Sequence, residues 1–462
     1  MTASLRSPAS SDGAESDVIG RDIHDVAKPA VLLDKAKMQR HCQTLRAATE
    51  RLGVDFRFHV KSHKTREGLK LQAGESAKNI RLVVSTIAEL EHMLPILQDF
   101  QTTGRHVNVL YGIPLPRSQV SRLAALGRRL GAGSISVQST TSVSWSMFPA
   151  GVFLKIDTGY HRAGLPPTGV NKSGLVESLM LLEQQGRATF VGLYSHSSLS
   201  YADSTPQKAL LNLENEIKGC LDALTINSHL FPAAQNLTIS VGASPQVTSI
   251  ETLTNPTQDT TSPSREATNL LRTIRSVAHA RPSGFRTTLE LHAGVYALLD
   301  VQQLATHSRG AQLGACEDEI AVSVVAEICS VYNDGERAQP EALAAVGTLG
   351  LGREPCGAYA GWGVVDREAY AGLGRQDSER RLVVARVSQE HSIMAWEQRR
   401  EGEGEEVSPV PPVPLEVGQT IRIYPNHACV AGALYPRYLI VDSSDDSGGR
   451  KVIDTWERAR GW

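Results

Sequence analysis

Residues 54–64, VDFRFHVKSHK, join a run typical of a β-strand to a group of cationic side chains. The strand-like part ends at Val60, and the sequence KSHK follows at once. Similar runs recur along the chain, separated by longer segments whose apolar residues return every three or four positions. This alternation predicts repeated βα units around a parallel sheet.

Eight or nine such strand-like runs can be identified before the pattern changes. They are AVLLD near 30, VDFRFHV ending at Val60, IRLVV near 82, HVNVLY near 108, SISVQ near 136, VFLKI ending at Ile156, TFVGLY ending at Tyr194, LTISV ending at Val241 and, as a ninth candidate, TLELH ending at His292. Helix-like segments between them cover 35–51, 87–97, 174–186 and 206–227. The natural closure of this pattern is a (β/α)8 TIM barrel.

The C-terminal part has a different pattern and predicts a separate all-β domain over 306–462, after a barrel over 26–305. Its strand-like runs, separated by turn-rich stretches, are DEIAVSVVAEICSVY, RLVVARVSQ, GQTIRIYP, RYLIVD and KVIDTW. Residues 1–25 are expected to form a disordered tail. Two polar segments, near 251–267 and 397–414, have too few apolar residues to offset the entropy of ordering, so we expect surface insertions there.

Composition narrows the classes of partner. The 462 residues include 47 basic and 49 acidic side chains, a formal charge of -2, which provides no field to hold nucleic acid or an anionic membrane. We find no apolar run near the roughly 20 residues that a membrane helix needs. The six cysteines have no CxxC spacing, which favours a reducing cytoplasmic setting. A small-molecule substrate is therefore expected.

Polar residues follow several of the predicted barrel strands directly. In a TIM barrel the loops after the strands form the active face, so these side chains should meet at one end of the barrel. They are Lys61, His63 and Lys64; Asp157, His161 and Arg162; His196 and Ser197; Gly242 and Ser244; and His292, Gly294 and Tyr296.

Two of these loops have more than one chemical interpretation. The segment RFHVKSHKT suits an amine with a lowered pKa that forms an imine, but its neighbouring cations could equally bind an anion. The segment SVGASPQ, at 240–246, offers small residues whose backbone N–H groups could hold a phosphate, although it could also be a plain turn.

His427 and Cys429 form a possible metal-binding pair. Their spacing of two on a predicted strand would place both side chains on one face, and a thiolate with an imidazole suits zinc. Zinc normally takes three or four ligands, however, and an HxC pair also arises by chance. The residues alone leave both possibilities open.

An ordered series of motifs resembles the fold-type III pyridoxal phosphate enzymes, namely D-serine dehydratases and D-threonine aldolases and, more distantly, alanine racemases. The series spans nearly the whole chain: KPAVLLD, FRFHVKSHKTREG, VVSTIAELEHM, LKIDTGYHRAG, VGLYSHSSLSY, SVGASPQ, LELHAGVYALLDVQQ, SQEHSIM, PNHAC and the terminal RGW. The chain departs from the family pattern at Phe58, Ser62 and Ala243, where proline, threonine, and serine or threonine are usual. None of these departures removes a reacting group.

The resemblance implies an alanine-racemase-like barrel that binds pyridoxal 5'-phosphate as a Schiff base on Lys61. Lys61 is also the implied catalytic residue, which takes the Cα proton, and Asp157 is a supporting residue. His292 lies where alanine racemases keep an arginine near the pyridine nitrogen. The implied cofactor-binding residues are Lys61, Arg162, Tyr194, His196, Gly242, Ser244, His292, Gly294, Val295 and Tyr296.

The resemblance also implies the metal and the reaction. D-serine dehydratases of this type carry HxC and bind zinc, whereas D-threonine aldolases tend toward HxD, so Zn²⁺ is expected on His427 and Cys429. The implied activity converts D-serine to pyruvate and ammonia, with D-threonine as a further candidate substrate. The alternative is aldolase-type cleavage of β-hydroxy D-amino acids. A cofactor-binding homeostasis protein would keep Lys61 but lack the second domain. A homodimer is expected, without nucleic acid or membrane partners.

Overall fold

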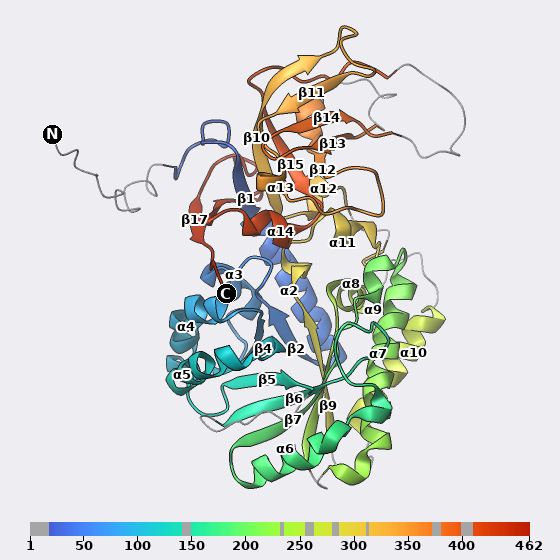
Figure 1. Cartoon of the computed structure of the whole chain (residues 1–462). Helices are drawn as coiled ribbons and strands as arrows, with labels where there is room; N and C mark the ends of the chain where they lie inside the picture. The colour runs from blue at the N-terminus through green and yellow to red at the C-terminus, as the bar shows by residue number, and fades with distance from the viewer. Residues whose placement is uncertain are drawn as a thin grey trace, which may run out of the picture.

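The computed structural model describes residues 18–140, 149–231, 235–254, 263–279, 286–310, 314–371, 380–398 and 410–462. Within these ranges a closed parallel barrel lies beside a domain built on a nine-stranded sheet (Figure 1). The predicted fold class, a TIM barrel joined to a C-terminal β domain, is confirmed.

The barrel contains eight parallel strands in chain order, closed by pairing of the first with the last. The strands are β2 (Asp55–His59), β3 (Asn79–Val84), β4 (His106–Pro114), β5 (Ile135–Ser139), β6 (Ala150–Lys155), β7 (Ala188–Tyr194), β8 (Asn236–Val241) and β9 (Arg286–Ala293). The α-helices of this part of the chain are α2 (Lys35–Leu52), α3 (Arg66–Ala73), α4 (Ile87–Thr102), α5 (Val120–Leu130), α6 (Leu175–Gln184), α7 (Pro206–Ile226), α8 (Ser244–Thr248), α9 (Glu251–Thr254), α10 (Arg265–His279) and α11 (Val301–Ala305).

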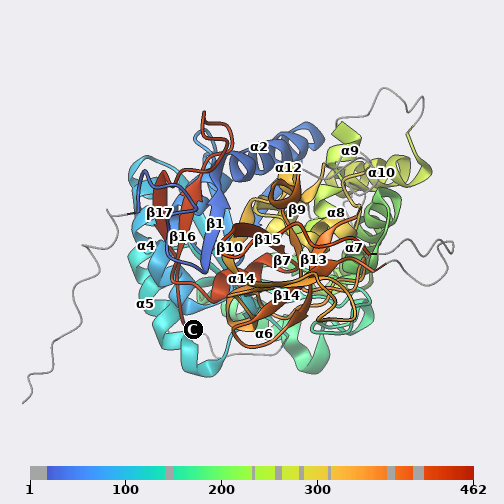
Figure 2. The same cartoon turned by 90° about the horizontal axis from the view of Figure 1, so that it is seen from above.

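The second domain is a sheet in the order β11-β14-β13-β12-β15-β10-β1-β16-β17. An additional pairing of β10 with β11 closes six of these strands into a ring, which lies over the end of the barrel (Figure 2). The strands are β1 (Ala30–Asp34), β10 (Val322–Tyr332), β11 (Glu341–Ala344), β12 (Gly363–Val365), β13 (Leu382–Val387), β14 (Ser392–Trp396), β15 (Thr420–Pro425), β16 (Arg437–Val441) and β17 (Asp454–Glu457), and the short helices are α12 (Cys316–Glu319), α13 (Thr348–Leu351) and α14 (Ala428–Ala433).

The prediction that AVLLD is the first barrel strand is wrong. This segment is β1, which pairs antiparallel with β10 and parallel with β16 in the second sheet. The ninth candidate, TLELH, is β9 and completes the barrel instead. A short apolar run reads alike in either sheet, and its partners here lie far away in the sequence.

Part of the predicted disordered tail, residues 18–25, is ordered against the second sheet. Ile23 is buried, and its N–H donates to the carbonyl of Arg450 at 2.8 Å. Residues 1–17 lie outside the described residues. Of the two predicted insertions, α9 and the start of α10 fall within 251–267, whereas 255–262 and 399–409 lie outside the described residues.

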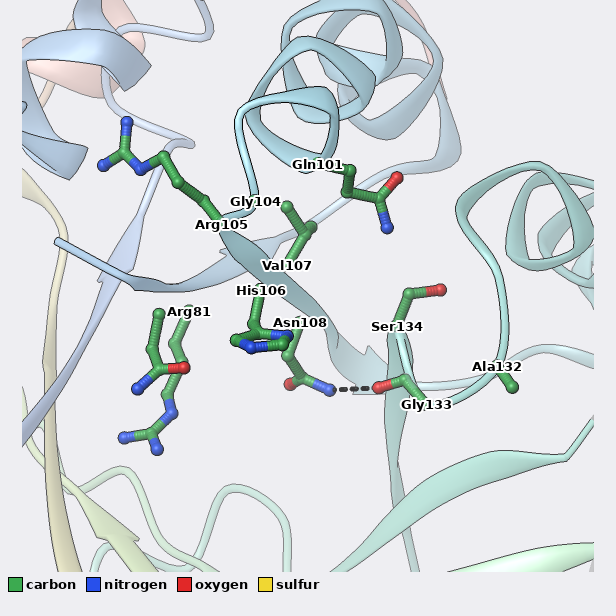
Figure 3. A pocket seen from close by; sticks show the side chains of 11 residues that line it. Arg81, Gln101, Gly104, Arg105, His106, Val107, Asn108, Ala132, Gly133 and Ser134 are labelled. Atoms are coloured by element: carbon green, nitrogen blue, oxygen red, sulfur yellow. Dashed lines mark hydrogen bonds between the residues drawn. The ribbon is translucent and has the colours of Figure 1, made fainter.

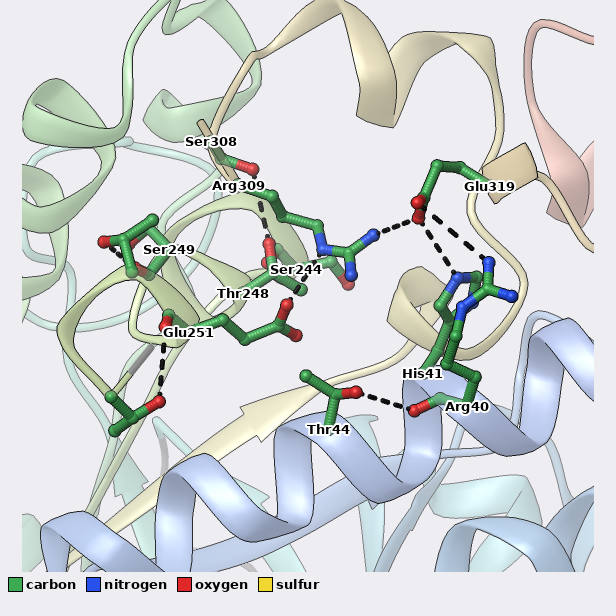
Figure 4. A network of polar contacts seen from close by, with 12 residues as sticks. Arg40, His41, Thr44, Ser244, Thr248, Ser249, Glu251, Ser308, Arg309 and Glu319 are labelled. Carbon is green, nitrogen blue, oxygen red and sulfur yellow. Dashed lines mark hydrogen bonds and ion pairs between the residues drawn. The ribbon is translucent and has the colours of Figure 1, made fainter. Parts of the chain in front are cut away.

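A buried ionic network joins the barrel to the second domain (Figure 4). The Arg309 guanidinium contacts Glu251 Oε2 at 2.9 Å and Glu319 Oε2 at 2.6 Å. Glu319 also lies 3.4 Å from Nε2 of His41, whose Nδ1 faces the carbonyl oxygen of Ala297 at 3.2 Å. The turn at 295–297 is thereby tied to helices of both domains. No helix in the described ranges is long and apolar enough to cross a bilayer.

Candidate active site

A cavity of about 540 Å³ lies where the barrel meets the second domain. The loop after β2 and the start of α4 line it from the barrel side, and residues around α14 and after β17 line it from the other side. Lys61, His427 and Cys429 are among its lining residues. The cavity therefore brings together the predicted cofactor lysine and the predicted metal pair.

Hydrogen bonds from three directions hold the Lys61 loop in place. The Lys61 N–H donates to Nδ1 of His59 at 3.3 Å, and His59 Nε2 faces the Ser85 hydroxyl at 3.3 Å. Burial, followed by the charge of Lys61, holds the pKa of His59 well below its ordinary value, so this imidazole is neutral. The Ser62 hydroxyl donates to the Gly294 carbonyl at 3.3 Å. The loop is thus fixed to two other strand ends.

The other cations of the KSHK segment have structural partners. Lys64 Nζ lies 2.9 Å from Oε1 of buried Glu89. His63 is fully buried, with Nδ1 near the Thr65 hydroxyl at 3.1 Å and Nε2 near Gln72 Oε1 at 2.9 Å. No described carboxylate lies within 4.0 Å of the Lys61 amine. Of the two lysines, Lys61 is the one without an ion pair in the described structure.

Three predicted side chains form a stack at the mouth of the barrel. The Tyr194 and His292 rings lie 4.3 Å apart at 4°, and the His196 ring lies 5.6 Å from that of His292 at 24°. His196 Nδ1 lies 2.6 Å from the Gly242 carbonyl oxygen. Burial, with a further effect from the charge of Lys61, lowers the pKa of His196 to about 3. This stack is an uncharged aromatic surface.

A chain of hydrogen bonds determines which nitrogen of His292 carries the proton. Arg57 Nε contacts Glu290 Oε1 at 2.7 Å, and the Ser240 hydroxyl donates to the same oxygen at 2.8 Å. Because Ser240 gives its proton to Glu290, its oxygen accepts from His292 Nδ1 at 3.1 Å. His292 Nε2 is then a bare acceptor, and it is buried without a partner among the described residues.

Small residues let two strand ends approach closely beside this stack. Gly242 has φ 146°, and a Cβ there would lie 2.3 Å from the His292 carbonyl oxygen. The Gly294 N–H donates to the Ser244 hydroxyl at 3.2 Å, and a Cβ at Gly294 would lie 3.0 Å from His59 Cβ. Val295 is buried next to Gly294. Larger side chains would therefore force these strand ends apart.

Two other predicted residues are not brought into this arrangement. The Arg162 side chain is exposed, with its guanidinium 5.1 Å from the Tyr160 ring centroid. The Tyr296 ring packs edge-on against Phe56, with ring centroids 5.5 Å apart. The buried hydroxyl of Tyr296 interacts with Cys42 of α2. For Tyr296, only the backbone is left to take part in a site. Asp157 accepts from two backbone N–H groups of its own loop.

The interpretation of the sequence missed two buried ionisable residues near the stack. Lys155 Nζ lies 4.7 Å from the Tyr194 ring centroid, and burial lowers its pKa to about 8. Glu216 accepts from the Ser197 N–H at 2.7 Å, and burial raises its pKa to about 7. For Lys155, its place within the apolar run VFLKI was a usable sequence signal. Glu216 lies in the middle of a helix, and no sequence signal marked it.

His427 and Cys429 are adjacent, but not on a strand as predicted. His427 precedes α14 and Cys429 lies in its first turn. Burial lowers the pKa of His427, but hydrogen bonding and charge interaction with Cys429 outweigh this and raise it to about 9. His427 Nδ1 is buried without a partner in the described structure. No described group of three or more His, Cys, Asp or Glu side chains could hold a metal ion.

A second cavity, of about 420 Å³, lies at the opposite end of the barrel strands (Figure 3). It is lined by residues at the starts of β3 and β4 and just before β5. Its Arg81 pairs with Asp55, and Arg105 donates to the carbonyls of Gly74 and Ala77. These cations are engaged in holding the fold, and in TIM barrels this end serves stability.

Comparisons with known proteins cover almost the whole chain. The family model described as "Alanine racemase, N-terminal domain" matches residues 33–251, and the model described as "Putative serine dehydratase domain" matches 321–441. The D-serine dehydratase of Schizosaccharomyces pombe is 28% identical over 97% of this chain and 95% of the relative. That of Saccharomyces cerevisiae is 27% identical over 97% of this chain and 100% of the relative.

Solved structures share the fold. D-threo-3-hydroxyaspartate dehydratase from Delftia sp. HT23 has a TM-score of 0.67 at 23% identity, covering 96% of this chain and all of that one. D-threonine aldolase from Filomicrobium marinum has a TM-score of 0.63 at 17% identity, covering 98% of both chains. One cysteine-to-alanine mutant of a D-threo-3-hydroxyaspartate dehydratase is described as being in the metal-free form.

Proposed function

We propose that this chain, which matches the alanine racemase N-terminal domain over 33–251 and the putative serine dehydratase domain over 321–441, is a D-serine dehydratase that uses pyridoxal phosphate and zinc. The observation that carries the proposal is the shared cavity of Lys61, His427 and Cys429. It places an amine without an ion pair beside a thiol and an imidazole, at the end of the barrel where TIM-barrel chemistry occurs.

The residues present suit pyridoxal phosphate. His292 Nε2 is a buried acceptor without a partner among the described residues, and Gly242 and Gly294 allow a close approach of strand ends that a Cβ would prevent. We propose that Lys61 holds the cofactor and that the Tyr194, His196 and His292 side chains flank it. Backbone N–H groups at Ser244, Val295 and Tyr296 are proposed to face its phosphate, next to the small residues Gly242 and Gly294. Arg162 lies on an exposed loop after β6. We propose that its side chain lies on the substrate side of the cofactor. When bound, the cofactor supplies an electron sink for negative charge at the substrate Cα.

The residues also suit a zinc ion. A soft thiolate and a buried imidazole nitrogen without a partner are suitable zinc ligands, and water or substrate would complete the coordination. Zinc held there by His427 and Cys429 would supply Lewis acidity toward the substrate β-hydroxyl, which is otherwise a poor leaving group.

The chain's own residues would act by position and by proton transfer. Lys61 Nζ takes the proton from Cα of D-serine, and its fixed loop determines the face from which it does so. The neutral stack of Tyr194, His196 and His292 provides an apolar wall that limits access of water. Elimination of the hydroxyl and hydrolysis of the released enamine then yield pyruvate and ammonia.

Pyruvate release tests this proposal directly. We expect pyruvate from D-serine and none from L-serine, with loss of activity after chelation and recovery on adding zinc. Glycine and acetaldehyde from D-threonine, without pyruvate from D-serine, would identify an aldolase instead. Unchanged activity with no zinc found by elemental analysis would exclude the role of the metal.

Further parts of the proposal rest on the resemblance. We propose that the enzyme is a homodimer that works in the cytoplasm on a free amino acid. Sedimentation velocity of the purified protein tests the oligomeric state: a single monomer species at micromolar concentration would contradict it.

A further inference from the structure

Arg458 is a buried cation in the wall of the active-site cavity. It follows β17 and lines the same cavity as Lys61, His427 and Cys429. The residue is only 6% exposed, and its Nε has no hydrogen-bond partner among the described residues. Arginine cannot lose its proton in a protein, so a buried guanidinium requires an opposite charge or a large expense of desolvation.

Two other well-buried arginines of the described structure have acidic partners. Arg57 pairs with Glu290 at 2.7 Å, and Arg309 pairs with Glu251 at 2.9 Å. For Arg458, no described carboxylate lies within 4.0 Å. The arrangement of Arg458 is therefore an exception that the fold itself does not explain.

Two other cations, Lys64 and Lys155, show how a cation near the active site can be accommodated without an external anion. Lys64, in the same cavity, already takes the carboxylate of Glu89 at 2.9 Å. Lys155 has no carboxylate within 4.0 Å in the described structure, but it faces the Tyr194 ring, and its pKa of about 8 lets it lose its proton above that pH, which an arginine cannot do. Arg458 has no carboxylate partner among the described residues and cannot lose its proton. An anion from outside the chain is therefore needed to balance its charge.

The backbone around Arg458 is held next to the Lys61 loop. The Arg458 N–H donates to the Pro436 carbonyl at 3.0 Å, and the Ala459 N–H donates to the Lys64 carbonyl at 2.9 Å. The Arg458 side chain also hydrogen-bonds the hydroxyl of buried Tyr438, which in turn donates to the Ser62 carbonyl at 3.3 Å. The guanidinium is thus anchored beside the loop that carries Lys61.

We propose that Arg458 binds the α-carboxylate of the amino acid substrate, an inference that rests on the proposed function. Lys61 marks the place of the substrate amine and Cα, and His427 and Cys429 mark that of the β-hydroxyl. The carboxylate is the remaining charged group, and a guanidinium can hold it through two parallel hydrogen bonds. Three separate attachments around one carbon distinguish the D from the L enantiomer.

Binding of two small ligands to the holoenzyme tests the proposal. D-Alanine carries the carboxylate but no hydroxyl to eliminate, and D-alaninol lacks the carboxylate. By isothermal titration we expect Arg458→Met to weaken D-alanine at least tenfold and to leave D-alaninol within about twofold, because a hydrogen-bonded charge contributes that much. Arg458→Lys should fall between the two. Arg450→Met, an exposed arginine of the same domain, is the matched control and should change neither affinity.

A second measurement separates a binding role from a structural one. Without ligand, Arg458→Met should melt at the same temperature as the wild type or higher, because it removes an unpaired buried charge. A lower melting temperature with equal weakening of both ligands would overturn the proposal. So would unchanged D-alanine affinity, or at least tenfold weaker binding of pyridoxal phosphate with D-alanine unaffected. The wild type could bind D-alanine through Arg458 and yet release no pyruvate from D-serine. That result would refute the dehydratase function but would still support the carboxylate site at Arg458.

Discussion

Lys61 is the residue on which the proposed chemistry depends. Replacing it by alanine and adding pyridoxal phosphate should abolish the imine absorbance and lower kcat by about 10²- to 10⁴-fold, because the proton acceptor is lost. Lys64→Met is the control: its amine pairs with Glu89, so the variant should lose stability but keep the imine band. Borohydride reduction followed by peptide mapping should label Lys61. A label at Lys64 would refute the assignment.

Cys429 tests the proposed metal at the same scale. Cys429→Ala removes the softer of two ligands, so we expect bound zinc to fall by about tenfold or more and elimination to be lost. The imine band should persist, since Lys61 is untouched. Cys329→Ala alters an exposed cysteine on β10 and should retain zinc. Elemental analysis of both variants decides, and full zinc content in Cys429→Ala would rule out the site.

At the residue scale, sequence patterns selected residues that meet in one cavity, but they predicted the local structure around those residues less well. The HxC spacing identified His427 and Cys429, but a spacing of two looks alike on a strand and at the start of a helix, so their local structure was wrong. Arg458 carries no local signal, because its burial depends on Pro436 and on the Lys64 loop, far away in the sequence. The zinc role and the individual cofactor contacts stay predictions.

At the scale of elements, β1 shows where the sequence reaches its limit. Eight of the nine strand-like runs are barrel strands, because each of them pairs with its neighbours in the sequence, and β2 and β9 pair with each other to close the barrel. β1 has the same apolar character but pairs with β10 and β16. An apolar sequence indicates that a strand is buried, but it does not indicate to which sheet the strand belongs.

The Arg309 network makes a prediction about how elements are held together. Arg309→Met removes the cation that pairs with buried Glu251 and leaves half-buried Glu319 with only His41 and the more distant Arg40, so we expect the free energy of unfolding to fall by about 3 kcal/mol. Arg122→Met breaks an exposed pair with Glu91 and should lower the free energy of unfolding far less, because solvent screens the two charges. Urea denaturation of the two variants measures the difference. Equal losses would mean that burial of the Arg309 network adds nothing.

At the scale of the whole molecule, buried ionisable groups make stability depend on pH. Glu216 is 1% exposed, and burial raises the pKa of its carboxyl from 4.5 to about 7. The folded state therefore prefers the neutral acid. The stability from this preference is complete below about pH 4.5 and is lost as the pH rises through about 7, a change of roughly 3 kcal/mol.

Glu216→Gln isolates this effect from the histidines. His63 and His196 have lowered pKa values, so their contribution grows with pH up to about 6.5, but it is the same in both proteins and cancels in the difference. Relative to wild type, the variant should gain roughly 3 kcal/mol in unfolding free energy between pH 4.5 and 7.5, because an amide does not ionise. Asp222→Asn, exposed on the same α7, should give a pH-independent difference. If Glu216→Gln and wild type follow parallel curves in urea denaturation, the carboxyl is already ionised in the folded protein.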